Sequence, residues 1–273
     1  MNKKKISIIL FVVSALCLLT SLIILIYPTI YDYQCRTRYY SDFESKATDE
    51  IMKSNIVVVR YEEKANGNVT SMSYGLGSSG VVFASDADKY YALTAYHVVK
   101  DCDMVEYIIV PYGAPTIEEC RENSETHIPN GMYYEQFSRA KVEFADEEYD
   151  LAVISFETDY TINMLDLSEA NPKYNEKIMV IGNPEGERFI KSYGRIKSKD
   201  YFVFDSKDGL SPTKAYKHNA YENHGSSGSV VLNEDMKIVG INIGGGTDSL
   251  GRFKYGAMVP CEQIKEFLEK WSA

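Results

Sequence analysis

Gly225-Ser-Ser227-Gly-Ser-Val-Val-Leu232 is the segment that decides how this chain is interpreted. Glycines on both sides of Ser227, followed by an apolar run, indicate a sharp turn that exposes the serine hydroxyl at the start of a buried strand. Such a turn would also leave backbone N–H groups pointing outward. Taken alone, the segment fits a plain Ser/Gly surface loop equally well, so other parts of the chain have to decide between the two interpretations.

Two other segments contain the residue types that a catalytic serine needs. Residues 91–99 (Tyr-Ala-Leu-Thr-Ala-Tyr-His-Val-Val) form an apolar run that presents His97, and residues 148–156 (Glu-Tyr-Asp-Leu-Ala-Val-Ile-Ser-Phe) open an apolar run with Asp150. Alone, such a histidine is more often a buried structural residue, and such an acid is more often a strand cap. Together with Ser227 they provide a nucleophile, a base to take its proton and an acid to orient the base.

The turn around Ser227 also offers the donors that acyl transfer requires. The tetrahedral intermediate carries an oxyanion, and one preorganised N–H donor is worth roughly 2.7–4 kcal/mol to it. The amides of Gly225 and Ser227 can supply two donors, and glycine at 225 leaves space for the substrate carbonyl. The chain order His, Asp, Ser is that of the chymotrypsin-type arrangement and differs from the orders of subtilisins and α/β-hydrolases.

The remaining pattern predicts an all-β fold. From Asn55 onward, short runs rich in Val, Ile, Tyr and Phe are bounded by Gly, Asn, Asp and Ser, which favours a closed or sandwiched β architecture. Residues 111–139 are the least strand-like stretch and are interpreted as a long insertion loop. Near the end, a proline that suits a first helical turn precedes an apolar stripe, which predicts a docked helix over 260–272. The stripe consists of Ile264, Phe267, Leu268 and Trp271.

The N-terminal part predicts a membrane anchor. Residues 6–26 contain no charged residue, and 21 residues at 1.5 Å each give a helix of about 31 Å, enough to cross the hydrocarbon core. Three lysines precede this run, so residues 1–5 are expected in the cytoplasm and everything after residue 26 outside a single-pass cell membrane protein. A cleaved signal peptide is the alternative, although its apolar region is usually shorter and ends at a small-residue site. Residues 27–54 are interpreted as a stalk or linker.

Charge and cysteine content narrow the function further. Beyond residue 26 the chain has 26 basic and 39 acidic residues, a formal charge of −13, which argues against nucleic-acid binding through net charge. An even number of cysteines outside the anchor permits two disulfides in an oxidising compartment, with three connectivities open and the pair 102/120 as the local choice. These cysteines are Cys35, Cys102, Cys120 and Cys261. No pair has zinc-ligand spacing, so the sequence predicts neither a metal site nor a cofactor.

At these residues the chain resembles the trypsin-like serine proteases, in particular bacterial HtrA (Deg) proteases, with features of glutamyl endopeptidases. Six segments in the family order carry the resemblance: 75–83, 94–99, 149–154, 180–186, 240–243 and 256–260. The resemblance implies two six-stranded antiparallel β-barrels of the chymotrypsin fold. The barrels are expected at about 55–160 and 175–259, within a protease domain over 55–273.

The chain departs from the family pattern in several places. It has Gly225-Ser-Ser-Gly-Ser229 where HtrA proteases usually have Gly-Asn-Ser-Gly-Gly. Ser226 stands where trypsin-like zymogens carry an aspartate, so activation through an ion pair with a new N-terminus is not expected. The sequence ends soon after the predicted helix, so the PDZ domain of typical HtrA proteins is not expected either. Asn242 stands where glutamyl endopeptidases use a histidine, so a preference for glutamate is not implied.

The family fold would place the walls of a specificity pocket just before the serine turn and on the strand near Asn242. This nominates five substrate-binding residues: Tyr221, Glu222, Ile243, Gly244 and Gly245. Glu222 could select a basic side chain, but in so acidic a protein it is interpreted as an acid at the pocket rim.

Together these features predict a membrane-anchored, extracytoplasmic serine endopeptidase that acts on polypeptides through His97, Asp150 and Ser227. A membrane-protein partner or a homo-oligomer is compatible with a domain tethered at a membrane. The alternative is a protease-like protein that holds a partner at the cell surface without cutting it. Loss of a triad residue would mark that alternative, and all three residues are present.

Overall fold

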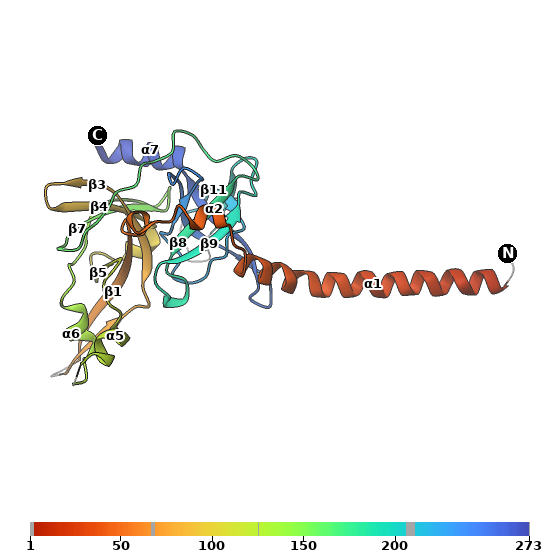
Figure 1. Ribbon diagram of the computed structural model, residues 1–273, viewed down its shortest axis with the longest axis horizontal. Coiled ribbons are helices and arrows are strands. Elements are labelled where there is room, and N and C mark those ends of the chain that lie inside the picture. Colours follow the sequence, from red (N-terminus) through yellow and green to blue (C-terminus); the bar gives the residue numbers. More distant parts are fainter. Residues whose placement is uncertain (1–2, 67–68, 125, 206–210, 273) are drawn as a thin grey trace.

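The computed structural model describes residues 3–66, 69–124, 126–205 and 211–272. Met1 and Asn2 of the predicted cytoplasmic end lie outside the described residues. Two curled antiparallel sheets stand side by side, and a long helix, α1 (Lys3–Arg36), projects from the body beside the second sheet (Figure 1). The sheets together carry the site described below.

The first sheet pairs its strands in the order β2-β1-β3-β4-β7-β6, with β5 on the other side of β1. It closes into a barrel because the Ile109 amide donates to the Ser138 carbonyl (3.0 Å) and the Ala140 amide donates to the Tyr107 carbonyl (2.7 Å). The strands are β1 Asn55–Asn66, β2 Val69–Tyr74, β3 Ser78–Asp86, β4 Lys89–Thr94, β5 Glu106–Pro111, β6 Lys141–Asp146 and β7 Leu151–Glu157.

The second sheet has the order β10-β11-β14-β13-β12-β8-β9. It closes between β9 and β11, where the Lys197 amide donates to the Lys217 carbonyl (2.7 Å) and the Asn219 amide donates to the Arg195 carbonyl (3.2 Å). The strands are β8 Lys177–Gly182, β9 Ile190–Arg195, β10 Phe202–Phe204, β11 Thr213–His218, β12 Val230–Leu232, β13 Ile238–Thr247 and β14 Phe253–Pro260.

The predicted all-β fold with two antiparallel barrels is confirmed, but within the described residues each sheet has seven strands instead of six. In the first sheet, β1 is long enough to pair with β3 in its first half and with β2 in its second half. In the second sheet, the short β10 adds three residues beside β11. The predicted number of six strands is the one that the family resemblance implies, and it does not include these additions.

Successive residues of the central strands face two different hydrophobic cores. In β3, Val81 packs between the barrels and Val82 packs inside the first barrel. In β12, Val230 packs between the barrels and Val231 packs inside the second barrel. Side chains alternate between the faces of a strand, so a strand buried on both faces reads as a continuous apolar run. This is why these strands stand out so clearly in the sequence.

Helix α7 (Cys261–Ser272) confirms the predicted C-terminal helix. Ile264 and Phe267 are fully buried, and Trp271 packs against Tyr91 of the first barrel with ring centroids 5.3 Å apart. Helix α7 directly follows β14 of the second barrel, and its Trp271 packs against the first barrel, so α7 bridges the two barrels. The other helices are short: α2 Ser41–Glu44, α3 Asp49–Met52, α4 Tyr96–Val99, α5 Ile117–Glu122, α6 Asn130–Tyr134 and the 3-10 helix η1 Pro184–Gly186.

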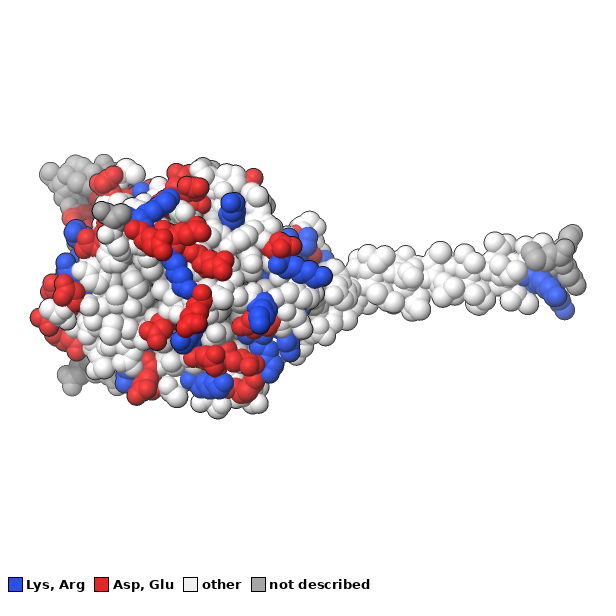
Figure 2. All heavy atoms as spheres, turned by 90° about the horizontal axis from the view of Figure 1, so that it is seen from above, with Lys and Arg blue, Asp and Glu red and all other residues white. Residues whose placement is uncertain are grey.

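Helix α1 contains an 18-residue window with a mean hydropathy of 3.0 that is not buried against the rest of the chain. It is therefore a candidate membrane anchor or signal sequence. On the face seen in Figure 2, no acidic or basic side chain lies along α1 between its basic N-terminal end and the globular body. The helix continues for ten residues beyond the apolar run, to Arg36.

Residues 27–54, the predicted stalk or linker, pack on the body along part of their length. Cys35 is buried, and Phe43 and Met52 join the hydrophobic core between the barrels. The burial of these three residues could not be predicted from the sequence, because the segment around them is polar and rich in tyrosine. This segment is therefore part of the folded unit instead of a free linker.

The two disulfides that the cysteine count permits do not form in the structure, where all five cysteines are free. Cys35 and Cys261 are buried, and the Cys261 thiol contacts the Asn171 side-chain oxygen at 3.5 Å. Cys102 follows α4 and Cys120 lies in α5, with the whole of β5 between them. The spacing of Cys102 and Cys120 along the sequence does not show that they belong to different structural elements.

Candidate active site

His97 is presented by a single helical turn at the end of a barrel strand. Strand β4 ends at Thr94, and Ala95 has extended backbone angles before α4 begins. The Thr94 hydroxyl donates to the Ser79 carbonyl (2.7 Å), which fixes the end of β4 against the start of β3. Val99, the last residue of α4, is buried, whereas His97 in the same turn is half-buried.

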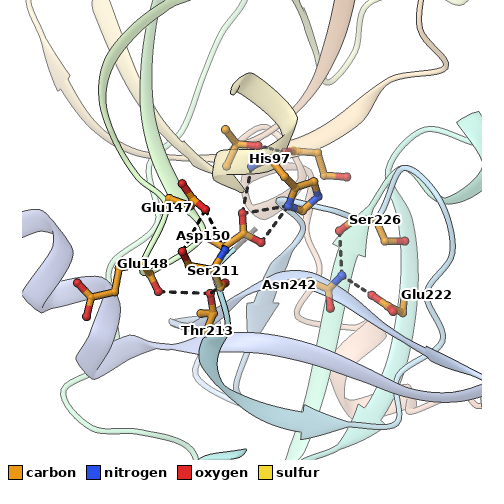
Figure 3. A network of polar contacts seen from close by, with 11 residues as sticks. His97, Glu147, Glu148, Asp150, Ser211, Thr213, Glu222, Ser226 and Asn242 are labelled. Carbon is orange, nitrogen blue, oxygen red and sulfur yellow. Dashed lines mark hydrogen bonds and ion pairs between the residues drawn. The ribbon is translucent and has the colours of Figure 1, made fainter. Parts of the chain in front are cut away.

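Asp150 holds both the backbone and the ring of His97. Its Oδ1 accepts a hydrogen bond from the His97 amide (3.0 Å), and its two carboxylate oxygens lie 3.0 and 2.9 Å from Nδ1 (Figure 3). A carboxylate can only accept, so Nδ1 must carry the proton. Nε2 of the neutral ring is then free to accept one, which is the tautomer that a general base requires.

The backbone at Asp150 adopts an uncommon conformation to make this contact. Its φ is 50°, in the left-handed region, and its side chain is almost fully buried just before β7. Aspartate tolerates this region better than most residues, but the conformation still costs free energy and persists only where surrounding contacts enforce it. The strain falls on the residue that orients His97.

The loop that carries Asp150 is joined to the second barrel by its neighbours. Glu147 accepts hydrogen bonds from the amide (2.9 Å) and the hydroxyl (3.1 Å) of Ser211, and the Thr213 hydroxyl donates to the Glu148 carbonyl (3.3 Å) (Figure 3). The position of Asp150 therefore depends on both barrels.

Ser227 lies half-buried in a turn that only glycine can form at two positions. Gly225 has φ 95° and Gly228 has φ 83°. A side chain at 225 would overlap the Asn183 carbonyl oxygen, and one at 228 would overlap the Ser79 carbonyl oxygen. The glycines that marked this turn in the sequence are thus required by both backbone conformation and close packing.

Two backbone amides of this turn remain available as donors. Among the described residues, neither the Gly225 amide nor the Ser227 amide donates a hydrogen bond to another backbone group, whereas the neighbouring Ser226 and Gly228 amides are both engaged. Both residues are half-buried, so these N–H groups can be reached by a ligand. These are the two amides that the sequence nominated for an oxyanion.

Ser79 joins the histidine segment to the serine turn. Its amide donates to the Ser227 carbonyl (2.8 Å), its carbonyl accepts from Thr94, and its hydroxyl donates to the Gly225 carbonyl (2.8 Å). The same hydroxyl accepts from the amide (3.0 Å) and the side chain (3.1 Å) of Asn183. Ser79 and Asn183 both lie in segments that carry the family resemblance, but the sequence indicates a role for neither.

The structure brings His97 and Asp150 into direct contact, while Ser227 is connected to them through Ser79 and Thr94. In the described part of the chain, the Ser227 hydroxyl makes no hydrogen bond with the His97 ring. Catalytic hydrogen bonds are often long in a free enzyme and shorten only in the complex with substrate.

The nominated pocket residues have different environments. Glu222 is half-buried and its carboxyl accepts from the Asn242 side chain, while Gly245 lies so close to this carboxyl that a side chain there would overlap it. Ile243, in contrast, is only 2% exposed and packs in the core between the barrels. Tyr221 packs edge-on against Phe253.

The Asn242 side chain has a defined orientation. Its nitrogen donates to the Ser226 carbonyl (3.1 Å) and to Glu222, and its oxygen lies 2.9 Å from His218 Nε2. Only the nitrogen can face a carbonyl, so His218 must donate through Nε2. Glu222 is the half-buried end of this set of contacts, and its partners Asn242 and His218 are fully buried.

Burial shifts the pKa of both ionisable members of this set toward the neutral form. Burial raises the pKa of Glu222 to about 8, opposed by the hydrogen bond from Asn242. Burial likewise lowers the pKa of His218 to about 4. Near neutral pH the set is therefore mainly uncharged, which is how such groups are accommodated away from water.

A surface cavity of about 250 Å³ lies beside the Gly225 turn on the side of the first barrel. Its lining includes Arg60, Leu76 and Val98. Within the described residues, no group of three His, Cys, Asp or Glu side chains is arranged to hold a metal ion.

Comparisons with known proteins give the family and the fold that the chain resembles. Residues 78–241 match the family described as trypsin-like peptidase domain. The chain is 27% identical over 168 residues to the serine protease Do-like HtrB of Bacillus subtilis and 30% identical over 173 residues to a serine protease HtrA-like protein of Staphylococcus epidermidis. Each alignment covers 60% of this chain but only 32% and 25% of these relatives, respectively.

A solved structure shares the fold. The crystal structure of the inactive form of the Mycobacterium tuberculosis protease Rv3671c superimposes with a TM-score of 0.56 at 15% identity, covering 82% of this chain and 91% of that one. At this identity the likeness concerns the fold alone.

Proposed function

Because this chain belongs to the family of trypsin-like peptidase domains, we propose that it is a serine endopeptidase in which Ser227 is the nucleophile, His97 the general base and Asp150 the residue that orients it. The observation that carries the proposal is the hydrogen bonding of the Asp150 carboxylate to His97, through one backbone and two side-chain contacts of 2.9–3.0 Å. These contacts select the His97 tautomer with a free Nε2.

In this mechanism His97 Nε2 takes the proton of Ser227 as the serine oxygen attacks the carbonyl carbon of a peptide bond. The imidazolium that forms already contacts the Asp150 carboxylate, so its charge is stabilised without rearrangement. When the C–N bond breaks, His97 returns the proton to the leaving amine. A water molecule then attacks the acyl group in the same way: His97 takes its proton and returns the proton to the Ser227 oxygen as the acyl group leaves.

The free amides of Gly225 and Ser227 are the proposed oxyanion donors. The hydrogen bonds from the Glu185 amide to the His224 carbonyl (2.6 Å) and from the Asn242 side chain to the Ser226 carbonyl (3.1 Å) support this role, since they fix the two peptide units that carry these amides before substrate binds. A preorganised donor does not have to reorient as the charge develops, which is why it accelerates the reaction.

The surroundings of the turn suggest how a polypeptide lies. We assign the acyl-side residue to the face formed by Tyr221, Glu222 and Gly245, and the leaving part to the cavity beside Gly225 and Leu76. The cavity volume of about 250 Å³ is large enough for one or two side chains, and Leu76 exposes most of its surface there.

The proposed location is outside a cell membrane, with α1 as the anchor and its N-terminal end in the cytoplasm. The apolar window of α1 and the lysines before it support this arrangement.

The activity is tested by labelling the full-length chain in detergent with a fluorescent fluorophosphonate and by following cleavage of an unfolded protein substrate. Ser227→Ala should abolish both signals, and Asp150→Asn should lower kcat by about 10⁴-fold, as the wrong tautomer does in serine proteases. Ser249→Ala, on an exposed loop, is the matched control and should behave as the wild type. An unlabelled wild type would contradict the proposal and favour the protein that binds a partner without cutting it.

The location is tested with the exposed thiol of Cys102. In intact cells treated with a mild reductant, a membrane-impermeant maleimide should label the wild type, and Cys102→Ser should lose most of this signal, since Cys120 is half-buried. Labelling that requires permeabilised cells would contradict the proposed orientation.

A further inference from the structure

The last ten residues of α1 contact the body instead of hanging free. The Arg252 guanidinium donates to the Thr29 hydroxyl (2.8 Å), and Asp32 Oδ1 accepts from the amide of Phe253 (2.8 Å), the first residue of β14. These contacts lie just beyond the apolar run, where the helix leaves the predicted membrane segment.

Arg36, at the end of α1, reaches the pocket wall. Its Nε donates to Asp32 Oδ2 (2.8 Å), and its guanidinium carbon lies 4.1 Å from the centre of the Tyr221 ring. A cation over a tyrosine face at this distance is attracted to the ring. Asp32 therefore contacts β14 with one oxygen and positions Arg36 over Tyr221 with the other.

Two contacts hold the segment that leads into the serine turn. Arg38 donates to the Asn219 carbonyl (2.7 Å), at the start of residues 219–226, and Arg36 covers Tyr221 two residues later. The 219–226 segment is thus fixed from outside by the residues that follow the apolar helix.

Tyr221 passes this constraint on to the turn. Its hydroxyl accepts from the Asn223 side chain (3.1 Å), the Asn223 carbonyl accepts from the Ser226 amide (2.9 Å), and the Asn223 amide donates to the Ser226 hydroxyl (3.2 Å). Ser226 lies between the two proposed oxyanion donors, so only a short series of contacts separates Arg36 from them.

We infer that residues 29–38 are a positioning element of the proposed active site, in which Arg36 acts through Tyr221 and Asn223 to hold the oxyanion turn. The inference rests on the proposed function. It makes the juxtamembrane end of α1 part of the working protease and predicts that the catalytic domain does not swing on a tether.

Arg36→Met in the full-length chain tests this inference, because it keeps the length of the side chain and removes its charge. We expect kcat per titrated active site to fall about tenfold with little change in KM, equivalent to one modest interaction acting in the transition state. Arg36→Lys, which keeps a cation over the ring, should recover most of the loss. A role confined to stability would lower the unfolding temperature and leave kcat per active site unchanged.

Arg139→Met is the matched control. Arg139 also pairs with an acid (Glu106, 2.8 Å), also lies over a tyrosine (Tyr61, 5.1 Å) and has a similar exposure, but it is on the first barrel, away from residues 219–226. Its replacement should leave kcat unchanged. An Arg36→Met variant with the kcat of the wild type, or equal losses in the two variants, would overturn the inference.

A second pair of measurements separates this inference from the proposed function. In a Ser227→Ala background, Arg36→Met should speed amide hydrogen exchange in peptides that cover residues 219–228, and unchanged exchange would overturn the inference whatever the activity. Tyr221→Phe keeps the ring and removes only the contact to Asn223, so it should also lower kcat. Failure of the wild type to label with fluorophosphonate would instead contradict the proposed function.

Discussion

Replacing Glu222 with glutamine is the sharpest test of the buried polar contacts at the pocket. Burial raises the pKa of Glu222 to about 8 from its ordinary value of 4.5. Glutamine has nearly the same shape, and its oxygen can still accept from Asn242, so the variant imitates the protonated acid at every pH.

The sign and size of the effect follow from proton binding. Between pH 4.5 and about 8 the unfolded chain has lost the Glu222 proton while the folded chain retains it, so the free energy of unfolding falls as pH rises. Each pH unit in this window costs about 1.4 kcal/mol, and the loss levels off above pH 8. The partial exposure of the side chain makes this figure an upper bound.

His218 also titrates, so the pH range of the unfolding measurements has to be chosen to exclude its contribution. The pKa of His218 is lowered to about 4, so its contribution to stability is present above pH 6.5 and is lost as pH falls toward 4. Measurements at pH 7, 8 and 9 therefore report on Glu222 without His218.

Urea unfolding of the full-length chain in detergent, followed by the fluorescence of Trp271, provides the assay, because Trp271 is the single tryptophan and packs against Tyr91 of the first barrel. From pH 7 to 8 the wild type should lose up to about 1.4 kcal/mol relative to Glu222→Gln, and at pH 9 the variant should be the more stable protein. Glu122→Gln, at an exposed acid of α5, should keep the wild-type slope. Equal slopes for wild type and Glu222→Gln would refute the reasoning.

Three further substitutions test the remaining contacts. Gly225→Ala forces a side chain onto a left-handed residue and against the Asn183 carbonyl, so fluorophosphonate labelling should fall by at least the roughly 10²-fold of one lost oxyanion donor; normal labelling would show that the turn tolerates a side chain. Ser79→Ala removes the hydroxyl shared by Gly225 and Asn183, and urea unfolding should show a loss of about 1–3 kcal/mol with a lower kcat; an unchanged kcat would separate Ser79 from the turn. Phe267→Ala empties a fully buried site between α7 and the barrels and should cost about 3–5 kcal/mol in the same assay, whereas a cost below 1 kcal/mol would mean that the core closes over the gap.

Much of the fold could be predicted from the sequence because its strands are buried on both faces. Such strands read as continuous apolar runs between glycine-containing turns, and the clearest runs, such as residues 151–156, are strands in the structure. The number of strands per barrel could not be predicted, because β10 is only three residues long and β2 pairs beyond the barrel.

The candidate site was predictable to the extent that its chemistry depends on residue type. A histidine after a strand and an aspartate before one nominated His97 and Asp150 only in combination with Ser227 and the chain order His, Asp, Ser, and the structure brings His97 and Asp150 together. Ser79 and Asn183 were missed because small polar residues beside glycines are common in loops, and only the closed barrels place them under the serine turn.

Long-range packing explains the other differences. Asp32, Arg36 and Arg38 resemble a solvated stalk in the sequence, yet each contacts a residue more than 180 positions away in the second barrel. Cys102 and Cys120, the local choice among three open pairings, are both free for a related reason, since closeness along the chain does not bring residues of separate elements together.

The sharing of β3 between two cores restricts how this chain can change in length. One extra residue inside β3 would exchange the sides of Val81 and Val82 and would move Ser79 out of line with the serine turn. A single-codon insertion there would therefore damage the packing of two compartments and the proposed catalytic turn at once. Insertions of the same size in the segment of α5 and α6 would meet neither constraint, so length variation should be concentrated in that segment.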